Sequence, residues 1–355
     1  MAVRYTRTTM SALFSAHSSF RIFAFSAVAT VAILLSVLFG VGIGALLTTI
    51  ILAVVELTFS FDNAILNAKV LGRLSRSWQM LFLTVGILVA IFGMRVVFPV
   101  VIVMLTAGLG WGKVIDLALH HPAQYAHHLE QAHASIAAFG GAFLLLLALT
   151  FFFDDGRKEH WISALERHLS RLSHWLIAPA VVVLVVVGVA LLPYNNHASE
   201  TLVAGLLGTA TYILLQTFNG LFARLQKPGA QAGGQVGVAA LMSLLYLEVL
   251  DASFSFDGVI GAFAITSNVL LIAAGLGIGA LWVRSLTVFM VRRHTLGNYI
   301  YLEHGAHYTV LILAIVLLAS IMLEISDYIP GLVGVGVIGA SVVTSVQNRR
   351  ATLKD

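Results

Sequence analysis

The sequence predicts an all-α membrane protein: a polytopic helical bundle of about ten transmembrane helices, arranged as two inverted-topology repeats. Three observations lead to this prediction. Of the 355 residues, 59% are hydrophobic and only 10% are charged, whereas a soluble domain is about 45–50% apolar and about 25% charged. The mean hydropathy is +0.96. Apolar runs long enough to cross a bilayer recur along the chain, and one acidic motif occurs in both halves.

The composition also excludes several classes of site. The chain has no cysteine, which excludes disulfides, thiolate nucleophiles and thiolate metal sites. The net charge of +4 comes from short basic clusters between apolar runs, where membrane proteins carry orientation signals. We therefore expect the lipid bilayer as a partner and no nucleic acid. No nucleotide-binding loop is found, so ATP-driven transport would need a separate subunit.

A helix needs about 20 mostly apolar residues to cross the hydrocarbon. Ten segments meet this requirement: 22–40, 42–68, 79–105, 134–153, 175–192, 200–222, 236–265, 268–290, 306–325 and 330–347. The second and seventh are long and carry acidic residues, so we expect their helices to be broken.

The basic residues orient these segments. Lys and Arg gather before the first segment, after the second, fourth, sixth and eighth, and at the C-terminal end, while the alternate loops are nearly free of them. Ten crossings with both termini on the cytoplasmic side satisfy the positive-inside rule at every loop. We predict a multi-pass membrane protein.

One motif occurs twice. Residues 56–65 read ELTFSFDNAI and residues 251–260 read DASFSFDGVI. The alignment places Glu56 opposite Asp251 and Asp62 opposite Asp257, and the next segment of each half carries one arginine, Arg95 or Arg284. In the predicted topology the two motifs run in opposite directions. We expect an N-terminal repeat over residues 1–192 and a C-terminal repeat over 193–355, a design that recurs in transporters.

Carboxylates inside a membrane must be protonated, paired, solvated or bound to a cation, since insertion of each costs about 2.5–3.5 kcal/mol. Six residues turn an ideal helix by about 600°, so Glu56 and Asp62 do not share a face of one helix. They converge if the helix unwinds between them, and Gly258 would favour the same unwinding in the second motif.

All the side chains of the two motifs that can bind a metal offer oxygen atoms. Hard cations such as Mg²⁺, Ca²⁺ and Mn²⁺ prefer such ligands. The predicted metal ligands are Glu56, Asp62, Asn63, Asp251 and Asp257, with Ser60 and Ser255 in support.

Two further interpretations stay open. The carboxylates are alternatively paired with Arg95 and Arg284 as buried ion pairs, which accounts for at most two of them. Glu248 lies one turn before Asp251, and its first-half counterpart is alanine. It is a proton carrier, a ligand on the access path, or an interfacial residue without a role.

Histidines form a second candidate feature. The segment 106–133, predicted to lie outside, is either a metal capture or release station or a solvated loop with a short helix. Its histidines are His120, His121, His127, His128 and His133. A weaker group on the inner side contains His294, Glu303, His304 and His307.

The first motif resembles the TerC family of bacterial membrane proteins, named for tellurium resistance. Its E-x-x-x-S-x-D-N-A element is matched by Glu56, Ser60, Asp62, Asn63 and Ala64. The family's second element, D-x-x-F-x-x-D-S, is matched at Asp251, Phe254 and Asp257, with Gly258 in place of serine. The chain is similar to a divergent, longer branch, and the resemblance implies a manganese exporter whose acidic motifs form the ion site.

The residues and the resemblance together predict a secondary transporter of divalent cations, exporting Mn²⁺, with protons as the possible counter-ion. Two alternatives remain. Asp62 and Asp257 would also suit an intramembrane aspartyl protease whose two carboxyls share a proton. A membrane scaffold that delivers metal to secreted enzymes would need the same site without net flux.

Overall fold

The computed structural model describes the backbone of residues 3–89, 92–93, 97–157, 159–172, 174, 176–225, 234–266, 268–293, 299–325 and 328–352. Side chains are described for these residues apart from 3–21, 59, 83–84, 87, 98, 106, 219–220, 222–225, 254–257, 260–261, 263–264, 328 and 351–352.

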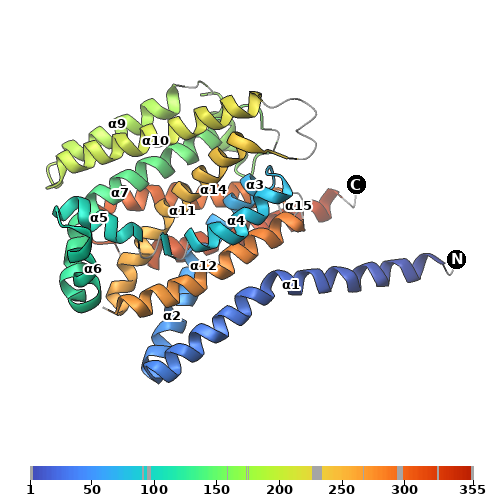
Figure 1. The fold of residues 1–355 in the computed structure, drawn as a ribbon. Coiled ribbons are helices and arrows are strands. Elements are labelled where there is room, and N and C mark those ends of the chain that lie inside the picture. The colour runs from blue at the N-terminus through green and yellow to red at the C-terminus, as the bar shows by residue number, and fades with distance from the viewer. Residues whose placement is uncertain are drawn as a thin grey trace.

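In this part of the chain the secondary structure is helical, and no β-strand is found (Figure 1). The helices are α1 (Val3–Gly40), α2 (Ile43–Phe59), α3 (Phe61–Leu71), α4 (Arg76–Leu88), α5 (Phe98–Ala107), α6 (Trp111–His120), α7 (Pro122–Phe152), α8 (Ser163–Ser170), α9 (Ile177–Leu191), α10 (Ala198–Leu225), α11 (Gly237–Ile265), α12 (Val269–Arg292), α14 (Leu302–Ser320) and α15 (Tyr328–Thr352).

Helix α7 forms the centre of the bundle. It packs against α5, α9, α10, α11 and α14, and its side chains from Phe143 to Ala148 are buried. Close approach to α10 requires a glycine, because a Cβ at Gly208 would overlap the carbonyl oxygen of Phe139. Small residues play this part in membrane bundles, where lipid gives helices no hydrophobic reason to associate and packing must do so.

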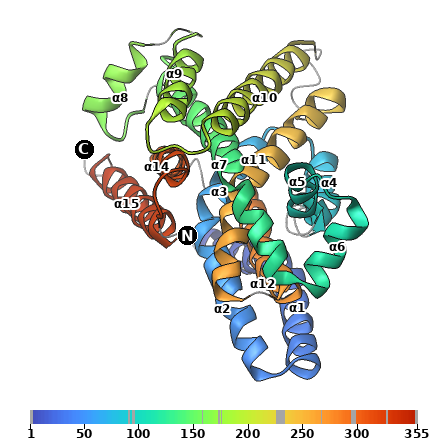
Figure 2. The same cartoon turned by 90° about the vertical axis from the view of Figure 1, so that its left-hand side faces the viewer.

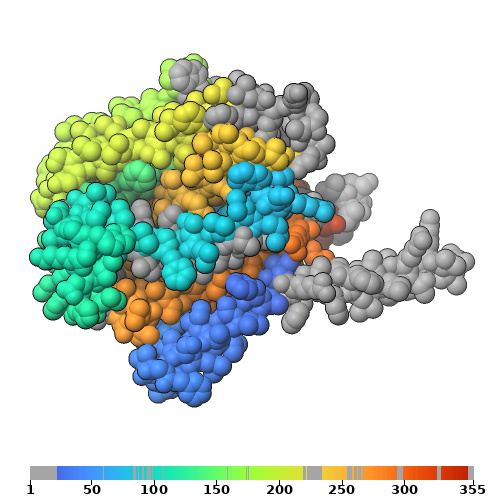
Figure 3. Space-filling model, viewed as in Figure 1, coloured from blue at the N-terminus to red at the C-terminus, as the bar shows by residue number. Residues whose placement is uncertain are grey.

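Helix α12 organises a second group of helices, α1 to α4, that position the candidate site. Figure 3 shows α3 and α4 forming the surface between α11 and α12. Polar contacts join α12 to α1: Ser26 Oγ donates to the Leu281 carbonyl at 3.0 Å, and Trp282 Nε1 donates to Thr30 Oγ1 at 3.0 Å. Figure 2 shows that the α14–α15 pair lies at a different edge of the bundle from the α1–α2 pair.

The outer helices expose large apolar side chains, such as Phe25 (62% exposed), Leu184 (71%) and Val203 (59%). Hydrocarbon accepts such a surface and water does not. Within the described residues, six helices are long and apolar enough to cross a membrane, or up to seven when the bent pair α2–α3 counts as one span. The chain is therefore a helical membrane bundle.

The predicted segment 79–105 contains α4 and α5. The described residues between these helices, 89, 92–93 and 97, are π-helical, and residues 90–91 and 94–96 lie outside the described part. The predicted loop 106–133 is largely helical: α5 ends at Ala107 and is followed by Gly108 in a left-handed conformation (φ 63°), α6 comes next, and α7 begins at Pro122. Glycine is favoured just after the end of a helix, and proline is favoured in its first turn.

Candidate functional site

The first motif lies across a break between two helices. α2 ends at Phe59, α3 begins at Phe61, and the helices are bent by 53° relative to each other. Ser60 between them has φ −96° and ψ 14°, which belong to the bridge region rather than to a helix. The break falls between Glu56 and Asp62, as predicted, so the two carboxylates belong to different helices.

The second motif lies within a continuous helix. α11 runs unbroken from Gly237 to Ile265, so the predicted break near Gly258 is wrong. Gly258 instead permits close packing, because a Cβ at this position would lie 3.1 Å from Glu56 Oε2. The missing side chain makes room for a carboxylate of the other motif, and the backbone of α11 keeps its helical hydrogen bonds.

Glu56 is buried where α2, α11 and α12 meet, with 4% of its surface exposed. Ser60 Oγ donates a hydrogen bond of 2.9 Å to Glu56 Oε1. On α12, Gly275 and Gly279 are four residues apart, and a Cβ at Gly279 would overlap Cβ and Cγ of Glu56. This G-x-x-x-G spacing lets the two backbones approach closely, and it directs the Glu56 carboxylate toward α11.

Asp62 and Asn63 lie in the first turn of α3. Asp62 is 2% exposed, and its Oδ1 accepts a hydrogen bond of 2.8 Å from the Asn63 backbone N–H. The first N–H groups of a helix have no intrahelical acceptor, and the helix dipole favours negative charge there. The Asn63 side chain leads to the other motif: its Nδ2 donates to Asp251 Oδ1 at 2.7 Å.

The contacts between the motifs are reciprocal. In the alignment Glu56 matches Asp251, and Asn63 matches Gly258, the residue that follows FSFD. Asn63 bonds to Asp251, and Gly258 lies against Glu56. The leading carboxylate of each motif therefore meets the residue after FSFD in the other. The sizes are complementary, since the longer acid faces glycine and the shorter acid faces asparagine.

Four of the five buried side-chain oxygen atoms that lack a hydrogen-bond partner among the described residues lie on α3 and α11. They are Asn63 Oδ1, Asn67 Oδ1, Glu248 Oε2 and Asp251 Oδ2. Such acceptors cost about 1–3 kcal/mol each when unsatisfied, so several on two neighbouring helices indicate a site that receives a donor or a cation. Asn67 was not among the predicted residues. Its position, one helical turn after Asn63, was the signal that could have identified it.

Arg284 pairs with the carboxylate that has no counterpart in the first half. Its Nη2 lies 3.3 Å from Glu248 Oε1, its Nη1 donates to the Phe82 carbonyl at 3.1 Å, and the guanidinium lies 4.2 Å from the Phe82 ring centroid. Arg284 thus joins α4, α11 and α12. The ion-pair interpretation holds for Glu248, and no described motif carboxylate pairs with Arg284.

Some predicted residues remain untested by this geometry. Arg95 lies outside the described residues, as do the side chains of Ser255 and Asp257, although the backbone of both belongs to α11. In the part of the chain that is described, no three His, Asp or Glu side chains converge closely enough to hold a metal ion. The described metal-binding groups at the contact are therefore one amide and one carboxylate, and Glu56 lies against Gly258, about two turns further along the same face of α11.

Two histidines of the second group, His304 and His307, make packing and polar contacts. His307 stacks on Phe151, with centroids 3.5 Å apart and planes at 11°. His304 Nε2 lies 2.9 Å from the Glu159 carbonyl and 3.4 Å from Glu166 Oε2. Glu166 is buried and accepts further bonds from the backbone of 161–162 and from the hydroxyl of residue 308. These contacts join the backbone at Glu159 and the side chain of Glu166 to α14. His294, the remaining member, lies outside the described residues.

Four of the five histidines predicted to lie outside are on α6 or α7, and His121 lies between these helices. His120 Nδ1 is 2.7 Å from Asp116 Oδ1 on α6, and the rings of His127 and His128 are 6.4 Å apart on α7. His133 Nε2 bonds to Ser320 Oγ at 3.0 Å, joining α7 to the end of α14. The described part of this segment therefore contains the short helix α6 and the start of α7, and no group of three metal-binding side chains is found in it.

Comparison with protein families shows which family the chain belongs to. Residues 61–352 match a family described as "Protein of unknown function (DUF475)". The match covers most of the chain, so the protein belongs to the DUF475 family. It includes the Asn63–Asp251 contact and begins after Glu56. No curated protein and no solved structure matches the chain.

Proposed function

We propose that this chain is a secondary transporter of divalent metal cations that exports Mn²⁺ across the bacterial cytoplasmic membrane. The observation that carries the proposal is the buried contact between the two motifs. The bond from Asn63 to Asp251 leaves Asn63 Oδ1 and Asp251 Oδ2 without a described partner. A hard cation accepts both an amide and a carboxylate oxygen as ligands, with water completing its shell.

Two arguments lead to Mn²⁺ as the proposed ion. Oxygen donors favour Mn²⁺, Ca²⁺ and Mg²⁺ as a class, and resemblance to the TerC family favours Mn²⁺ within it. Glu56 and Asp62 lie in the same first motif, and Asp257 in the second, so they are the further ligands. Movement of α3 relative to α11 would bring them to the ion, because the break at Ser60 separates α3 from α2.

The predicted topology has support from contacts between loops. Ser75, after α3, donates from its backbone N–H to the Gln235 carbonyl before α11, at 3.0 Å. His304 at the start of α14 bonds to the Glu159 carbonyl after α7. These segments all belong to loops that the basic residues predict to be cytoplasmic, and they lie at one end of the bundle.

The reciprocal contacts of Glu56 and Asp251 support two repeats related by a pseudo-twofold axis. In transporters of this design the substrate binds at the repeat interface, and rocking of one repeat against the other alternates access. Carboxylates that release a cation accept protons. Asp251, and Glu248 one turn away, are therefore the groups that would couple export to a proton gradient.

Metal flux in proteoliposomes tests the proposal. Wild-type protein, Asp62→Asn and Asp251→Asn are compared for Mn²⁺, Ca²⁺, Mg²⁺ and Zn²⁺. The matched control is Asp116→Asn, the same chemical change at an exposed carboxylate on α6. We expect saturable Mn²⁺ flux, lowered about 10- to 100-fold in the two site variants, since a lost charged ligand costs about 1.5–3 kcal/mol.

The same preparation separates the alternatives. Metal binding without flux of any ion would favour the scaffold that delivers metal. Cleavage of a transmembrane peptide, lost in both Asp62→Asn and Asp257→Asn, would favour the aspartyl protease. Equal flux in Asp251→Asn and wild type would contradict the proposed site.

A further inference from the structure

A pocket of about 200 Å³ opens at the end of the bundle where the basic loops meet, between α3, α7, α10 and α11. Its charged lining consists of three basic side chains, Lys69, Arg73 and Arg157, and one carboxylate, Asp154. Like charges gathered around one cavity repel each other, and the repulsion grows where the surroundings are partly buried. An anion in the pocket would relieve it.

Two of the three cations are held in place by the protein. The Arg157 guanidinium lies over the Phe151 ring, 2.9 Å from its centroid, with Nε 3.5 Å from Asp154 Oδ2. Lys69 forms an ion pair with Glu303, and its Nζ lies 5.4 Å from the same ring. Burial lowers the pKa of Arg157, and the nearby Glu303 and Asp154 oppose that change. The guanidinium is thus fixed before any ligand arrives.

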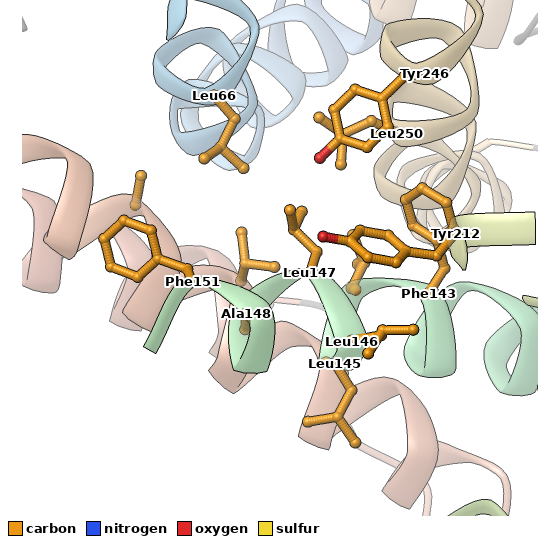
Figure 4. Packing of buried hydrophobic residues seen from close by; sticks show 14 of the residues in the cluster. Leu66, Phe143, Leu145, Leu146, Leu147, Ala148, Phe151, Tyr212, Tyr246 and Leu250 are labelled. Carbon is orange, nitrogen blue, oxygen red and sulfur yellow. The ribbon is translucent and has the colours of Figure 1, made fainter. Parts of the chain in front are cut away.

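Polar neutral groups line the opposite wall. Tyr212 and Tyr246 are both buried, and Figure 4 shows their hydroxyl groups directed toward the space beside α3 and α7. Gln216 Nε2 donates to the Tyr212 hydroxyl at 3.0 Å. The side chains of Leu66 and Leu250 also line the pocket. They stand on α3 and α11 close to Asn63 and Asp251, so the pocket adjoins the contact between the motifs.

We infer that this pocket is an oxyanion site that binds a phosphate group, supplied either as free phosphate or as the headgroup of a phospholipid. An arginine and a lysine around a cavity, with hydroxyl donors opposite, match the multiple acceptors of a phosphate. Basic pockets between helices on the cytoplasmic side also receive anionic headgroups. This inference is independent of cation transport, because it concerns different residues and the opposite charge.

Binding of inorganic phosphate is measured by isothermal titration of the purified full-length protein in detergent, at constant ionic strength set with chloride. Wild type is compared with Arg73→Gln and Arg157→Gln. Arg76→Gln is the control, because Arg76 lies at the same end of the bundle but lines a different groove. We expect saturable binding, weakened at least tenfold in the two pocket variants and unchanged within twofold in the control.

A second arm identifies the source of the phosphate. The same four proteins are placed in nanodiscs of phosphatidylcholine with phosphatidic acid, and retained lipid is measured by native mass spectrometry. Retention of phosphatidic acid that both pocket variants lose, without binding of free phosphate, supports the site with a lipid headgroup as its ligand. Arg73 is exposed, so its variant keeps the test valid if Arg157→Gln fails to fold. The inference is overturned if neither ligand distinguishes Arg73→Gln from Arg76→Gln.

Discussion

The two FSFD motifs share four consecutive residues but differ in backbone. The first is broken at Ser60, and α3 starts anew with Asp62 at its positive end. The second continues through α11 without interruption. The identical residues therefore do not determine the break. Local polar contacts accompany the break. The Ser60 hydroxyl donates to Glu56, and the Asp62 carboxylate accepts a hydrogen bond from the Asn63 N–H in the first turn of α3.

Two of the positions that differ between the motifs form the contacts between them. Glu56 and Gly258 form one contact, and Asp251 and Asn63 form the other. In one contact the long Glu56 side chain faces Gly258, and in the other the short Asp251 side chain faces Asn63. The total side-chain volume of the two contacts is therefore similar. This packing explains the glycine at position 258. Variants that alter only one of the two motifs test this difference.

The largest expected effect concerns Glu248 and Arg284, a pair that the first half lacks. Arg284→Met would leave a buried carboxylate without its cation and destabilise the protein by about 3–5 kcal/mol. The double variant with Glu248→Met should recover most of this loss, because an apolar pair of similar volume replaces two charges. The midpoint of thermal unfolding in detergent measures both. Arg292→Met, an exposed arginine at the end of the same helix, serves as the control. A double variant no more stable than Arg284→Met would contradict the pairing.

Close packing of α12 on α2 gives the next effect. Gly279→Val would push against the Glu56 stem and cost about 1–3 kcal/mol, the range for overpacked sites. Gly336→Val is the matched control, because a Cβ at Gly336 would meet nothing within 4 Å. Unfolding midpoints of the two variants should differ clearly. Equal midpoints would show that the glycine contact does not limit the approach of the helices.

A size exchange tests the reciprocal contacts. Gly258→Asn alone should crowd Glu56 and weaken Mn²⁺ binding by about tenfold, equivalent to about 1.4 kcal/mol. Adding Glu56→Asp shortens the opposing acid. Positions 56 and 258 then carry the same acid–amide pair as Asp251 and Asn63. Equilibrium binding of radioactive Mn²⁺ should then recover at least in part. Further loss in the double variant would refute the complementarity of the two contacts.

The smallest effect concerns the hydroxyl at the break. Ser60→Ala removes one donor to Glu56 and should cost about 1 kcal/mol, near the mean for a hydrogen bond. Ser253→Ala is a fitting comparison, because Ser253 Oγ bonds only to the Val249 carbonyl of its own helix among described groups, at 2.9 Å. Mn²⁺ affinity should fall about fivefold in Ser60→Ala and hardly change in Ser253→Ala. Equal affinities would remove Ser60 from the site.

Sequence reasoning predicted the membrane class and the break in the first motif, since both follow from local composition and from two acids that cannot share a helical face. It failed at Gly258, because a glycine permits a bend but equally permits a close neighbour, and only the packed structure distinguishes the two. It missed Asn67, and it did not assign Glu248 to Arg284. Partners 36 residues apart on different helices depend on how α11 and α12 cross, which no local pattern contains.

The central claim is that Asn63 and Asp251 act together in one cation site. A double-mutant cycle on Mn²⁺ affinity tests it most directly, using purified wild type, Asn63→Ala, Asp251→Ala and the double variant. If the two residues hold one ion, each single variant should lose most of the binding and the double variant should lose little more. Losses of the single variants that add independently, or Mn²⁺ affinity unchanged in all three, would contradict the account.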